Sequence, residues 1–375
     1  MISILTTFLA YAIPFIFVLT IVVFFHELGH FMVARWCGVK IDAFSVGFGR
    51  EIFGWYDRKG TRWKVAMIPL GGYVKFAGDE NAASVPNPEL IAAMSEEERR
   101  STFIAKPVWQ RMAVVVAGPV ANFILSIVIF AAVFMLFGRV VTTPLVDKVE
   151  PNSAAAAAGL QQGDLITAID GDAITTFQDL QRVVSMSAGE KLLLDVRRDG
   201  QVLEVSVTPQ LKEIKDRFGN PQQVGILGVA RSPKPEDYKT IHYGPVSALG
   251  EGARQTYYVV AQTVGYLVKV VQGRESADQL GGPIRVAQVS GEVATLGFVP
   301  LLTLAAILSV SIGFLNLLPI PMLDGGHLAY YVAELIRGKP LSERVQDIGF
   351  RIGMAVVLLL MIFATWNDVL RLTDL

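Results

Sequence analysis

Four long runs of the chain contain no charged side chain. Residues 1–25, 112–138, 293–323 and 352–367 lack Asp, Glu, Lys and Arg altogether. The first three runs exceed the roughly 20 residues that a helix needs to cross a bilayer. The fourth reaches that length if residues 348–350 and a snorkelling Arg351 extend it. The pattern predicts four membrane-spanning helices.

The residues between the first two spans have a strand-like pattern. Residues 44–53, 62–68 and 73–76 mix apolar and polar positions, and Asp57-Arg58-Lys59-Gly60 is a turn signal between them. We expect a membrane-associated β-hairpin region here. Residues 81–100 are expected to form a mobile or short helical stretch.

The residues between the second and third spans predict a small α/β domain. Strands are expected at residues 145–150, 164–170, 192–197, 202–208 and 225–230, with helices at 153–160 and 176–187. Residues 245–271 have the apolar periodicity of an amphipathic helix, typical of a segment that lies at the membrane surface.

These elements predict a polytopic α-helical membrane protein with one inserted α/β domain. The expected order is a spanning helix at 1–35, the β region and its loop at 36–107, a second span at 108–138, the α/β domain at 139–232, the amphipathic segment at 233–292, a third span at 293–327, a loop at 328–347, and a fourth span with the tail at 348–375.

Composition and charge exclude several classes of protein. Charged residues make up 18% of the chain, against about 25% in an average soluble protein. A net charge of −1 gives no electrostatic basis for nucleic-acid binding. The single Cys37 excludes an internal disulfide framework and a Cys-rich zinc site. Residues 1–25 lack the basic start of a signal peptide, so we expect a retained helix.

Lys and Arg predict the orientation in the membrane. They gather between the first and second spans and again between the third and fourth, where Arg337, Lys339 and Arg344 lie. Cytoplasmic loops carry the excess of positive charge. Both loops are therefore expected in the cytoplasm, and both termini and residues 139–292 outside it.

His26-Glu27-Leu28-Gly29-His30 is the strongest chemical signal. Positions i and i+4 share a helix face, so both imidazoles can bind one metal ion. Glu27 lies one step round the helix, where it can take a proton from water at that metal. A chance match is the alternative, but ionisable groups at the end of an apolar helix are costly unless paired or metal-bound.

A third ligand is expected, because catalytic zinc usually has three from the protein. His242 is interpreted as an ordinary exposed histidine. At the end of the third run, prolines and glycines interrupt the helix, as occurs where backbone lines a cavity in a membrane. Either Asp324 or His327 could supply the ligand. Asn316 could bond a neighbouring helix or stabilise the oxyanion of a scissile carbonyl.

Together these residues resemble the site-2 protease family of intramembrane zinc metalloproteases. This likeness is carried by the His26–His30 motif together with Asn316-Leu317-Leu318-Pro319 and Leu323-Asp324-Gly325. The RseP-like branch, the regulators of sigma-E proteases, is indicated by further motifs: Ile68-Pro69-Leu70-Gly71-Gly72-Tyr73-Val74-Lys75, Gly118-Pro119-Val120-Ala121-Asn122-Phe123, Gly282-Pro283-Ile284 and Ser342-Glu343-Arg344-Val345-Gln346-Asp347. The resemblance covers nearly the whole chain.

The resemblance implies a site and a cofactor. Zinc, one ion per chain, would bind His26, His30 and Asp324, with Glu27 as acid/base and Asn316 holding substrate. Residues 118–123 would pack near the site. We further expect Gly325-Gly326 to interrupt the helix between Asp324 and His327, and a carboxylate to offset zinc charge in a low-dielectric site.

The inserted domain resembles a circularly permuted PDZ domain. Gly159-Leu160-Gln161-Gln162-Gly163-Asp164 carries the likeness, and Ile226-Leu227-Gly228-Val229 matches the ligand-binding loop. Many members of this branch have two such domains in tandem, whereas residues 139–292 have space for one. The expected PDZ ligand is a peptide C-terminus or an exposed segment.

The implied function is hydrolysis of peptide bonds in or near transmembrane segments, in a bacterial inner membrane. A single-pass, anti-sigma-factor type of protein is the expected substrate, with signal-peptide remnants as another. An edge strand with Ile68, Gly71, Gly72 and Tyr73 could pair with extended substrate; the alternative is a plain cytoplasmic hairpin. A silent PDZ scaffold would show damaged ligands, and a transporter would show repeated halves; the chain shows neither.

Overall fold

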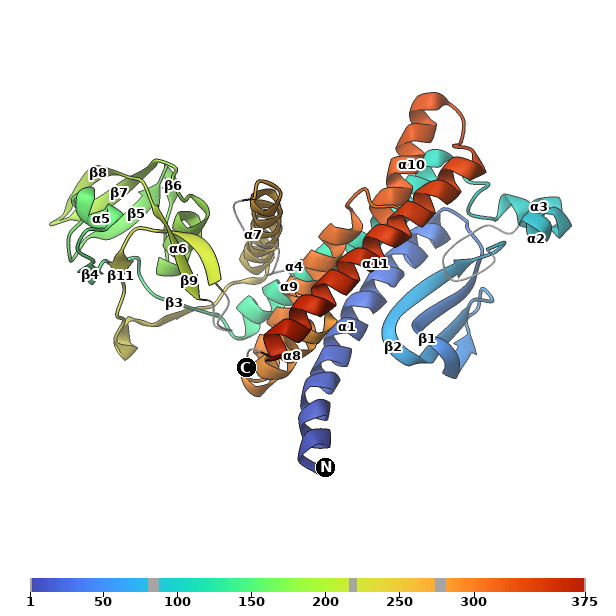
Figure 1. The fold of residues 1–375 in the computed structure, drawn as a ribbon, viewed down its shortest axis with the longest axis horizontal. Helices are drawn as coiled ribbons and strands as arrows, with labels where there is room; N and C mark the ends of the chain where they lie inside the picture. Colours follow the sequence, from blue (N-terminus) through green and yellow to red (C-terminus); the bar gives the residue numbers. More distant parts are fainter. Residues whose placement is uncertain (1, 80–87, 216–220, 274–280, 374–375) are drawn as a thin grey trace. The chain divides into compact units, whose positions relative to one another are not determined.

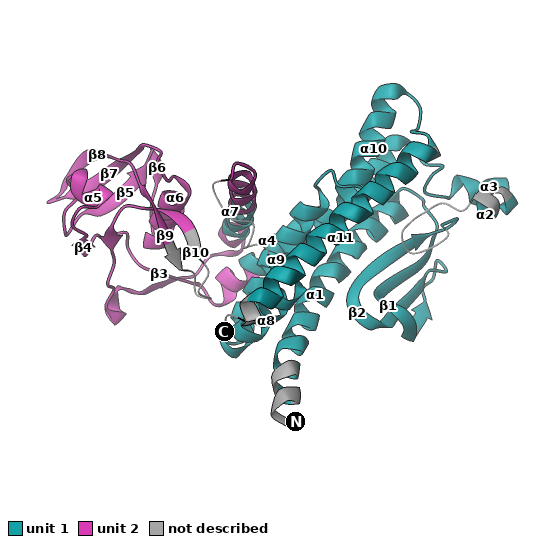
Figure 2. Cartoon of the chain, in the orientation of Figure 1, with its two compact units in different colours: residues 1–131, 249–260, 280–375 teal, residues 132–248, 261–279 magenta. Residues whose placement is uncertain are grey.

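The computed structural model describes residues 2–79, 88–215, 221–273 and 281–373. The chain forms two compact units, drawn in different colours in Figure 2. Residues 1–131, 249–260 and 280–375 form the first, which we call the membrane unit. Residues 132–248 and 261–279 form the second, the inserted unit.

Among the described residues, four helices are long and apolar enough to cross a membrane, as the sequence predicts. They are α1 (Ile2–Trp36), α4 (Val108–Leu136), α9 (Phe298–Asn316) and α11 (Glu343–Thr373) (Figure 1). Val18 and Val22 of α1 are buried against Leu301 and Ala305 of α9. Apolar contact between the helices, with lipid around them, is the packing expected of a polytopic membrane protein.

The third span is shorter than the sequence predicts. Residues 293–327 were expected to form one interrupted helix, but α8 (Pro283–Thr295) ends before α9 begins, and α9 ends at Asn316. Gly297 lies between α8 and α9 with a φ of 115°, a conformation that favours glycine. Pro319 and Pro321 lack the N–H that a helix needs, so residues 317–323 form an irregular link.

The expected loop at 328–347 is wrong in its first half, because α10 (Asp324–Arg337) occupies it. The expectation that Gly325-Gly326 interrupts a helix is also wrong, since both glycines lie in the first turn of α10. A Cβ on Gly325 would strike the carbonyl of Leu318, and one on Gly326 the carbonyl of Ile320. The glycines thus let α10 pack against the link before it.

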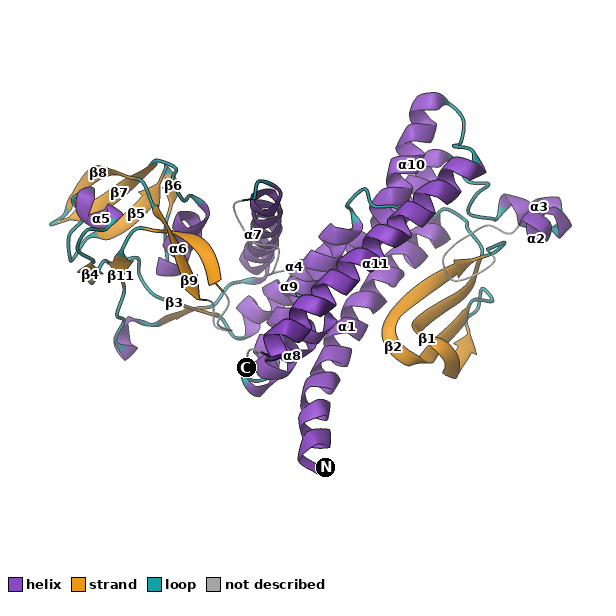
Figure 3. Cartoon of the chain, in the orientation of Figure 1, coloured by secondary structure: helices purple, strands orange, loops and turns teal. Residues whose placement is uncertain are grey.

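The β region is made of two long bent strands, β1 (Ile41–Tyr56) and β2 (Arg62–Phe76) (Figure 3). The first half of β1 lies between the two halves of β2, because Val46 pairs with both Gly72 and Val65. The second half of β2 therefore forms one edge of the sheet. Phe44 of β1 is fully buried with Phe31 of α1.

Two short helices follow the β region, α2 (Pro88–Ala93) and α3 (Glu96–Arg100). They fall in the stretch expected to be mobile or helical, whose residues 81–87 lie outside the described residues. Ser95 caps α3, with Glu98 completing a capping box.

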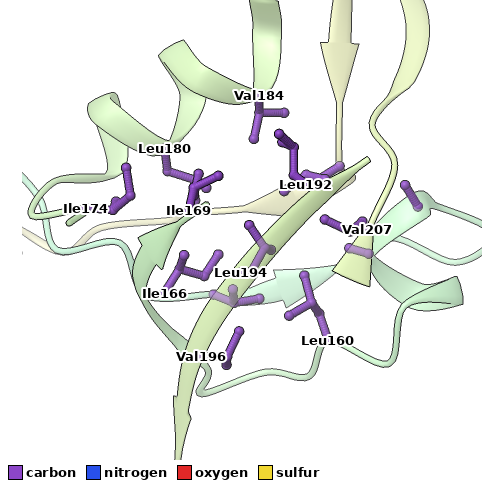
Figure 4. Packing of buried hydrophobic residues seen from close by; sticks show 14 of the residues in the cluster. Leu160, Ile166, Ile169, Ile174, Leu180, Val184, Leu192, Leu194, Val196 and Val207 are labelled. Atoms are coloured by element: carbon purple, nitrogen blue, oxygen red, sulfur yellow. The ribbon is translucent and has the colours of Figure 1, made fainter. Parts of the chain in front are cut away.

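The inserted unit is built on a four-stranded sheet in the order β6-β5-β7-β8. These strands are β5 (Leu165–Ile169), β6 (Asp172–Ala173), β7 (Leu192–Arg198) and β8 (Gln201–Val207). Two helices accompany it, α5 (Ala154–Ala157) and α6 (Phe177–Met186). Ile166, Leu180 and Leu194 are among the buried residues that pack between α6 and the sheet (Figure 4).

Shorter strand pairs complete this unit. They are β3 (Arg139–Val141) with β12 (Lys239–Ile241), β4 (Lys148–Val149) with β11 (Val229–Ala230), and β9 (Gln210–Lys215) with β10 (Pro221–Ile226). The single strand expected at 225–230 is interrupted at Gly228, whose φ is 80°. The β3–β12 pair brings the entry and exit of the domain together.

The described residues of the segment 233–292, which is expected to be amphipathic and helical, include helix α7 and most of helix α8. The 3-10 helix η1 (Pro235–Asp237) comes first and α7 (Pro245–Val271) follows it. Helix α8 begins near the end of the segment, at Pro283. The bounds of α7 are those that its periodicity predicts.

Candidate metal centre

The end of α1 places two imidazoles side by side. His26 and His30 are one helical turn apart, and their Nε2 atoms are 3.2 Å from each other. Two glycines make room for the rings, because a Cβ on Gly29 would strike the carbonyl of Ala117 and one on Gly118 would strike the His30 ring. Helix α4 can therefore pack directly against the motif.

Asp324, the first residue of α10, brings a carboxylate to the same point. Its Oδ2 lies 3.1 Å from His26 Nε2 and its Oδ1 lies 3.5 Å from His30 Nε2. Oδ2 is buried and forms no hydrogen bond with the residues that the structure describes. In those residues, His26, His30 and Asp324 form the one group of His, Cys, Asp or Glu side chains placed to hold a metal ion.

The spacing of these three donors fits tetrahedral zinc. Ligand atoms about 2.0–2.2 Å from such an ion stand about 3.3–3.6 Å apart. The measured separations of 3.1, 3.2 and 3.5 Å are close to that range. Two neutral imidazoles and one carboxylate are also a known catalytic zinc set, which leaves a fourth position open.

The other two histidines lie outside this group. His327 lies one turn after Asp324 on α10, and its ring stands nearly perpendicular to that of Tyr330, with centroids 6.5 Å apart. His242 is exposed, as the sequence predicts. The structure therefore brings Asp324 to the pair of imidazoles and does not bring His327 there.

Helix α4 contacts the far side of both imidazoles. His30 Nδ1 lies 2.8 Å from the carbonyl oxygen of Val114, and His26 Nδ1 lies 3.3 Å from Asn122 Nδ2. The resemblance predicts that residues 118–123 pack near the site but does not single out these contacts. Val114 makes this contact through its backbone carbonyl, so its side-chain type could not have predicted the contact.

Asn316, the last residue of α9, approaches from the open side. Its Nδ2 lies 3.4 Å from His26 Nε2. The amide thus stands next to the three donor atoms, where it can reach a molecule bound between them.

Glu27 faces the free edge of β2. Its carboxylate lies beside the backbone N–H of Val74. A Cβ on Gly72 would lie 3.1 Å from Glu27 Cγ and 2.8 Å from the carbonyl oxygen of Ser45. A larger residue at position 72 would therefore separate this edge from Glu27.

The other expected substrate contacts lie on the same strand, next to Phe48. Tyr73 stacks on Phe48, with ring centroids 6.0 Å apart. A Cβ on Gly71 would strike the Phe48 ring, and Ile68 pairs with Phe48 across the sheet. Gly72 is thus the residue of this set that the structure brings to Glu27.

A salt bridge holds α10 to α4. Arg111 of α4 donates two hydrogen bonds to the carboxylate of Glu334, at 3.1 and 2.6 Å. Both side chains are only 13% exposed, and the guanidinium also lies over the Tyr331 ring. Because Asp324 starts α10, this pair helps to fix the carboxylate relative to the imidazoles.

The inserted unit has a cavity of its own, of about 540 Å³. Residues of α6 form one wall, and Ile226, Leu227, Gly228 and Val229 form another. The structure therefore brings the expected PDZ ligand loop against α6. Asp179 of α6 forms a salt bridge with Arg139 of β3, the first strand of the unit, with 3.2 Å between Oδ1 and the guanidinium nitrogen.

Comparison with known proteins gives consistent matches over nearly the whole chain. The profile described as peptidase family M50 matches residues 14–360. A protein of Agrobacterium fabrum named as a zinc metalloprotease, Atu1380, is 50% identical over 96% of this chain and 95% of its own. Metalloprotease MmpA of Caulobacter vibrioides is 41% identical, over 97% and 96%.

A third relative comes from Salmonella typhimurium. Its regulator of sigma-E protease, RseP, is 34% identical over 96% of this chain and 98% of its own. Among solved structures, the PDZ domain of an SdrC-like protein of Listeria monocytogenes matches 23% of this chain and 82% of that one, at 23% identity. Its TM-score of 0.18 is too low to establish a shared fold.

Proposed function

The chain belongs to peptidase family M50 and is a zinc metalloprotease, and from this premise we propose that it hydrolyses peptide bonds within or beside the transmembrane segments of other membrane proteins. The observation that carries the proposal is the convergence of His26, His30 and Asp324 at the ends of helices in a multi-pass membrane unit. A peptidase site built there can reach bonds that soluble proteases cannot.

The three converging side chains would hold the zinc ion. When bound, zinc supplies a Lewis acid that makes water more acidic and polarises the scissile carbonyl. His26 and His30 would bind it through Nε2, since these atoms face Asp324. The carboxylate offsets one unit of the metal charge in a low-dielectric site.

Glu27 would act as the general base and then as the general acid. It takes the proton of the attacking water and passes it to the leaving amine. The neighbouring Val74 N–H places the carboxylate at the edge of β2. Asn316, next to His26 Nε2, would donate to the carbonyl oxygen of the substrate as negative charge develops on it.

The edge of β2 would hold the substrate. A transmembrane helix hides its amides in intrahelical bonds, so the substrate must become extended before cleavage. Residues two apart on a strand direct their backbone groups to the same side. Gly72 therefore presents its N–H and C=O on the edge where Val74 meets Glu27, and an added strand there would lie beside the acid/base.

The inserted unit would regulate and not catalyse. Its described residues contain no group of metal-ligating side chains. Its cavity, walled by α6 and residues 226–229, is concave and suits an extended peptide end. We propose that a peptide C-terminus or exposed segment binds there, and that the unit selects which substrates reach the site.

The proposed setting is the bacterial inner membrane, with both termini and the inserted unit outside the cytoplasm. The relative in Salmonella typhimurium is named a regulator of sigma-E protease. By this likeness, the proposed substrate is a single-pass membrane protein of the anti-sigma-factor type.

The test is cleavage by purified protein in proteoliposomes. A panel of single-pass membrane proteins is presented to the wild type, to Glu27→Gln, and to Glu96→Gln as a matched control at an exposed acid. We expect fragments cut in or beside the spanning segment from the wild type and Glu96→Gln, and none from Glu27→Gln with its zinc retained. Equal cleavage by Glu27→Gln would contradict the mechanism, and cuts confined to the soluble domains of the panel, away from the spanning segments, would contradict the proposed cleavage position.

A further inference from the structure

Each ligand imidazole needs a partner for its second nitrogen. When Nε2 of a neutral imidazole gives its lone pair to a metal ion, the ring carries its proton on Nδ1. A buried N–H without an acceptor costs about 1–3 kcal/mol. The atoms that face Nδ1 of His26 and His30 therefore decide how well these rings can serve as ligands.

For His30 this partner is fixed by the backbone. The Val114 carbonyl, 2.8 Å from Nδ1, can only accept a hydrogen bond, so it selects the form with the proton on Nδ1. For His26 the partner is the side chain of Asn122, which is fully buried. Its amide meets Nδ1 at 3.3 Å, and its Oδ1 has no hydrogen-bond partner among the residues that the structure describes.

An amide side chain has two ends of the same shape. A half-turn about its last bond exchanges Oδ1 and Nδ2 without moving any neighbour. With Oδ1 toward the ring, the His26 Nδ1–H donates to Oδ1. This orientation gives the buried oxygen its partner and leaves Nε2 free to face Asp324 and His30.

We infer that Asn122 is a positioning residue for the metal centre, whose Oδ1 accepts the Nδ1–H of His26 and so keeps Nε2 available as a ligand. The inference rests on the zinc site of the proposed function. It gives α4 one role at both ligands, through Val114 at His30 and through Asn122 two turns later at His26.

Helix α9 holds Asn122 in place. Ser309 Oγ donates to the backbone carbonyl of Asn122 at 2.9 Å. Gly313 lies so close that an added Cβ would be 3.1 Å from Asn122 Cβ and 3.1 Å from the carbonyl oxygen of Pro119. The side chain is thus fixed from behind, as outer partners of metal ligands must be to orient them.

The test is zinc affinity, measured by competition with a chelator on the purified full chain. All variants carry Glu27→Gln, so the readout does not depend on proteolysis and is separate from the test of the function. Asn122→Leu has the same shape without an acceptor, and Asn122→Asp keeps an acceptor. Ser126→Ala, one turn further along α4, removes a hydrogen bond to Thr256 that does not touch the site.

We expect Asn122→Leu to weaken zinc binding about 10–100-fold, the usual loss for an outer partner of a metal ligand. Asn122→Asp and Ser126→Ala should bind zinc at least as tightly as the parent. The absorption spectrum of bound Co²⁺ should change in Asn122→Leu and stay tetrahedral in Asn122→Asp.

Two outcomes would overturn the inference. One is parental zinc affinity in Asn122→Leu. The other is a loss of more than about 10-fold in a folded Asn122→Asp, which would mean that Asn122 acts through its Nδ2–H donor and not as an acceptor. If Asn122→Leu does not fold, the comparison of Asn122→Asp with the parent still decides between an acceptor and a donor role for the side chain.

Discussion

The carboxylate of Asp324 at the start of α10 lies 3.1 Å from the imidazole of His26 near the end of α1. This contact brings together an early and a late helix of the chain, because α1 ends at Trp36 and α10 begins only at Asp324. His327, one turn further on the same helix, does not reach that point. A single helix thus offers two candidate ligands and turns one of them toward the imidazoles.

The first prediction follows from this contact. Asp324→Ala should lose zinc, with affinity falling by more than the roughly 10–100-fold typical of outer partners, whereas His327→Ala should largely keep it. Metal analysis of the two purified variants decides between them. Zinc at the wild-type level in Asp324→Ala, together with loss in His327→Ala, would reverse the assignment.

Local pattern was enough to predict the spans, because charge-free length is a direct requirement of the bilayer. It was also enough for the pair His26 and His30, because i, i+4 spacing places two side chains on one face. The choice of Asp324 as the third member of this group needed either the family resemblance or an argument about charge. Nothing in the sequence alone gives the distance between α1 and α10.

The features that the sequence does not predict correctly all depend on how one helix packs against another. Gly325-Gly326 looked like an interruption because glycine disfavours helices on average. In the structure these glycines are where the first turn of α10 touches the preceding link, so close packing outweighs propensity. Asn122 and Val114 were not picked out individually for a similar reason, since their contacts depend on how α4 lies against α1.

The second prediction concerns orientation in the membrane. Tags in the hairpin of β7 and β8 and at the C-terminus should be accessible from outside the cell. A tag in residues 81–93 should be accessible only from the cytoplasm, because the basic loops stay inside. Labelling with an impermeant reagent before and after permeabilisation measures this. Labelling of residues 81–93 in intact cells would invert the topology.

The third prediction concerns the inserted unit. Deleting residues 145–230 should leave zinc content unchanged, since the metal centre lies wholly in the membrane unit. The paired strands β3 and β12 keep the two cut ends close together. The range of substrates should widen toward those with longer external domains. A folded deletion variant that cuts no short membrane substrate would instead make the unit part of the catalytic apparatus.

The last prediction concerns the contact between α1 and the turn of the β region. Burial alone would raise the pKa of Asp57, but hydrogen bonds from Trp63 and Arg35 outweigh it and lower that pKa from 3.8 to about 2. Arg35 lies at the end of α1, so this carboxylate ties the β1–β2 turn to the helix that carries Glu27.

A lowered carboxyl pKa stabilises the folded form above its unfolded value of 3.8, and this stabilisation is lost as the pH falls toward about 2. At about pH 7, Asp57→Asn should therefore destabilise the β region by about 1–2 kcal/mol, with allowance for partial exposure. Asp42→Asn, at an exposed acid of β1, is the matched control. Hydrogen–deuterium exchange of the β2 amides measures the effect. The gap between wild type and Asp57→Asn should close as the pH is lowered through this window, and a gap that persists at about pH 2 would show that the carboxylate charge is not what holds the turn.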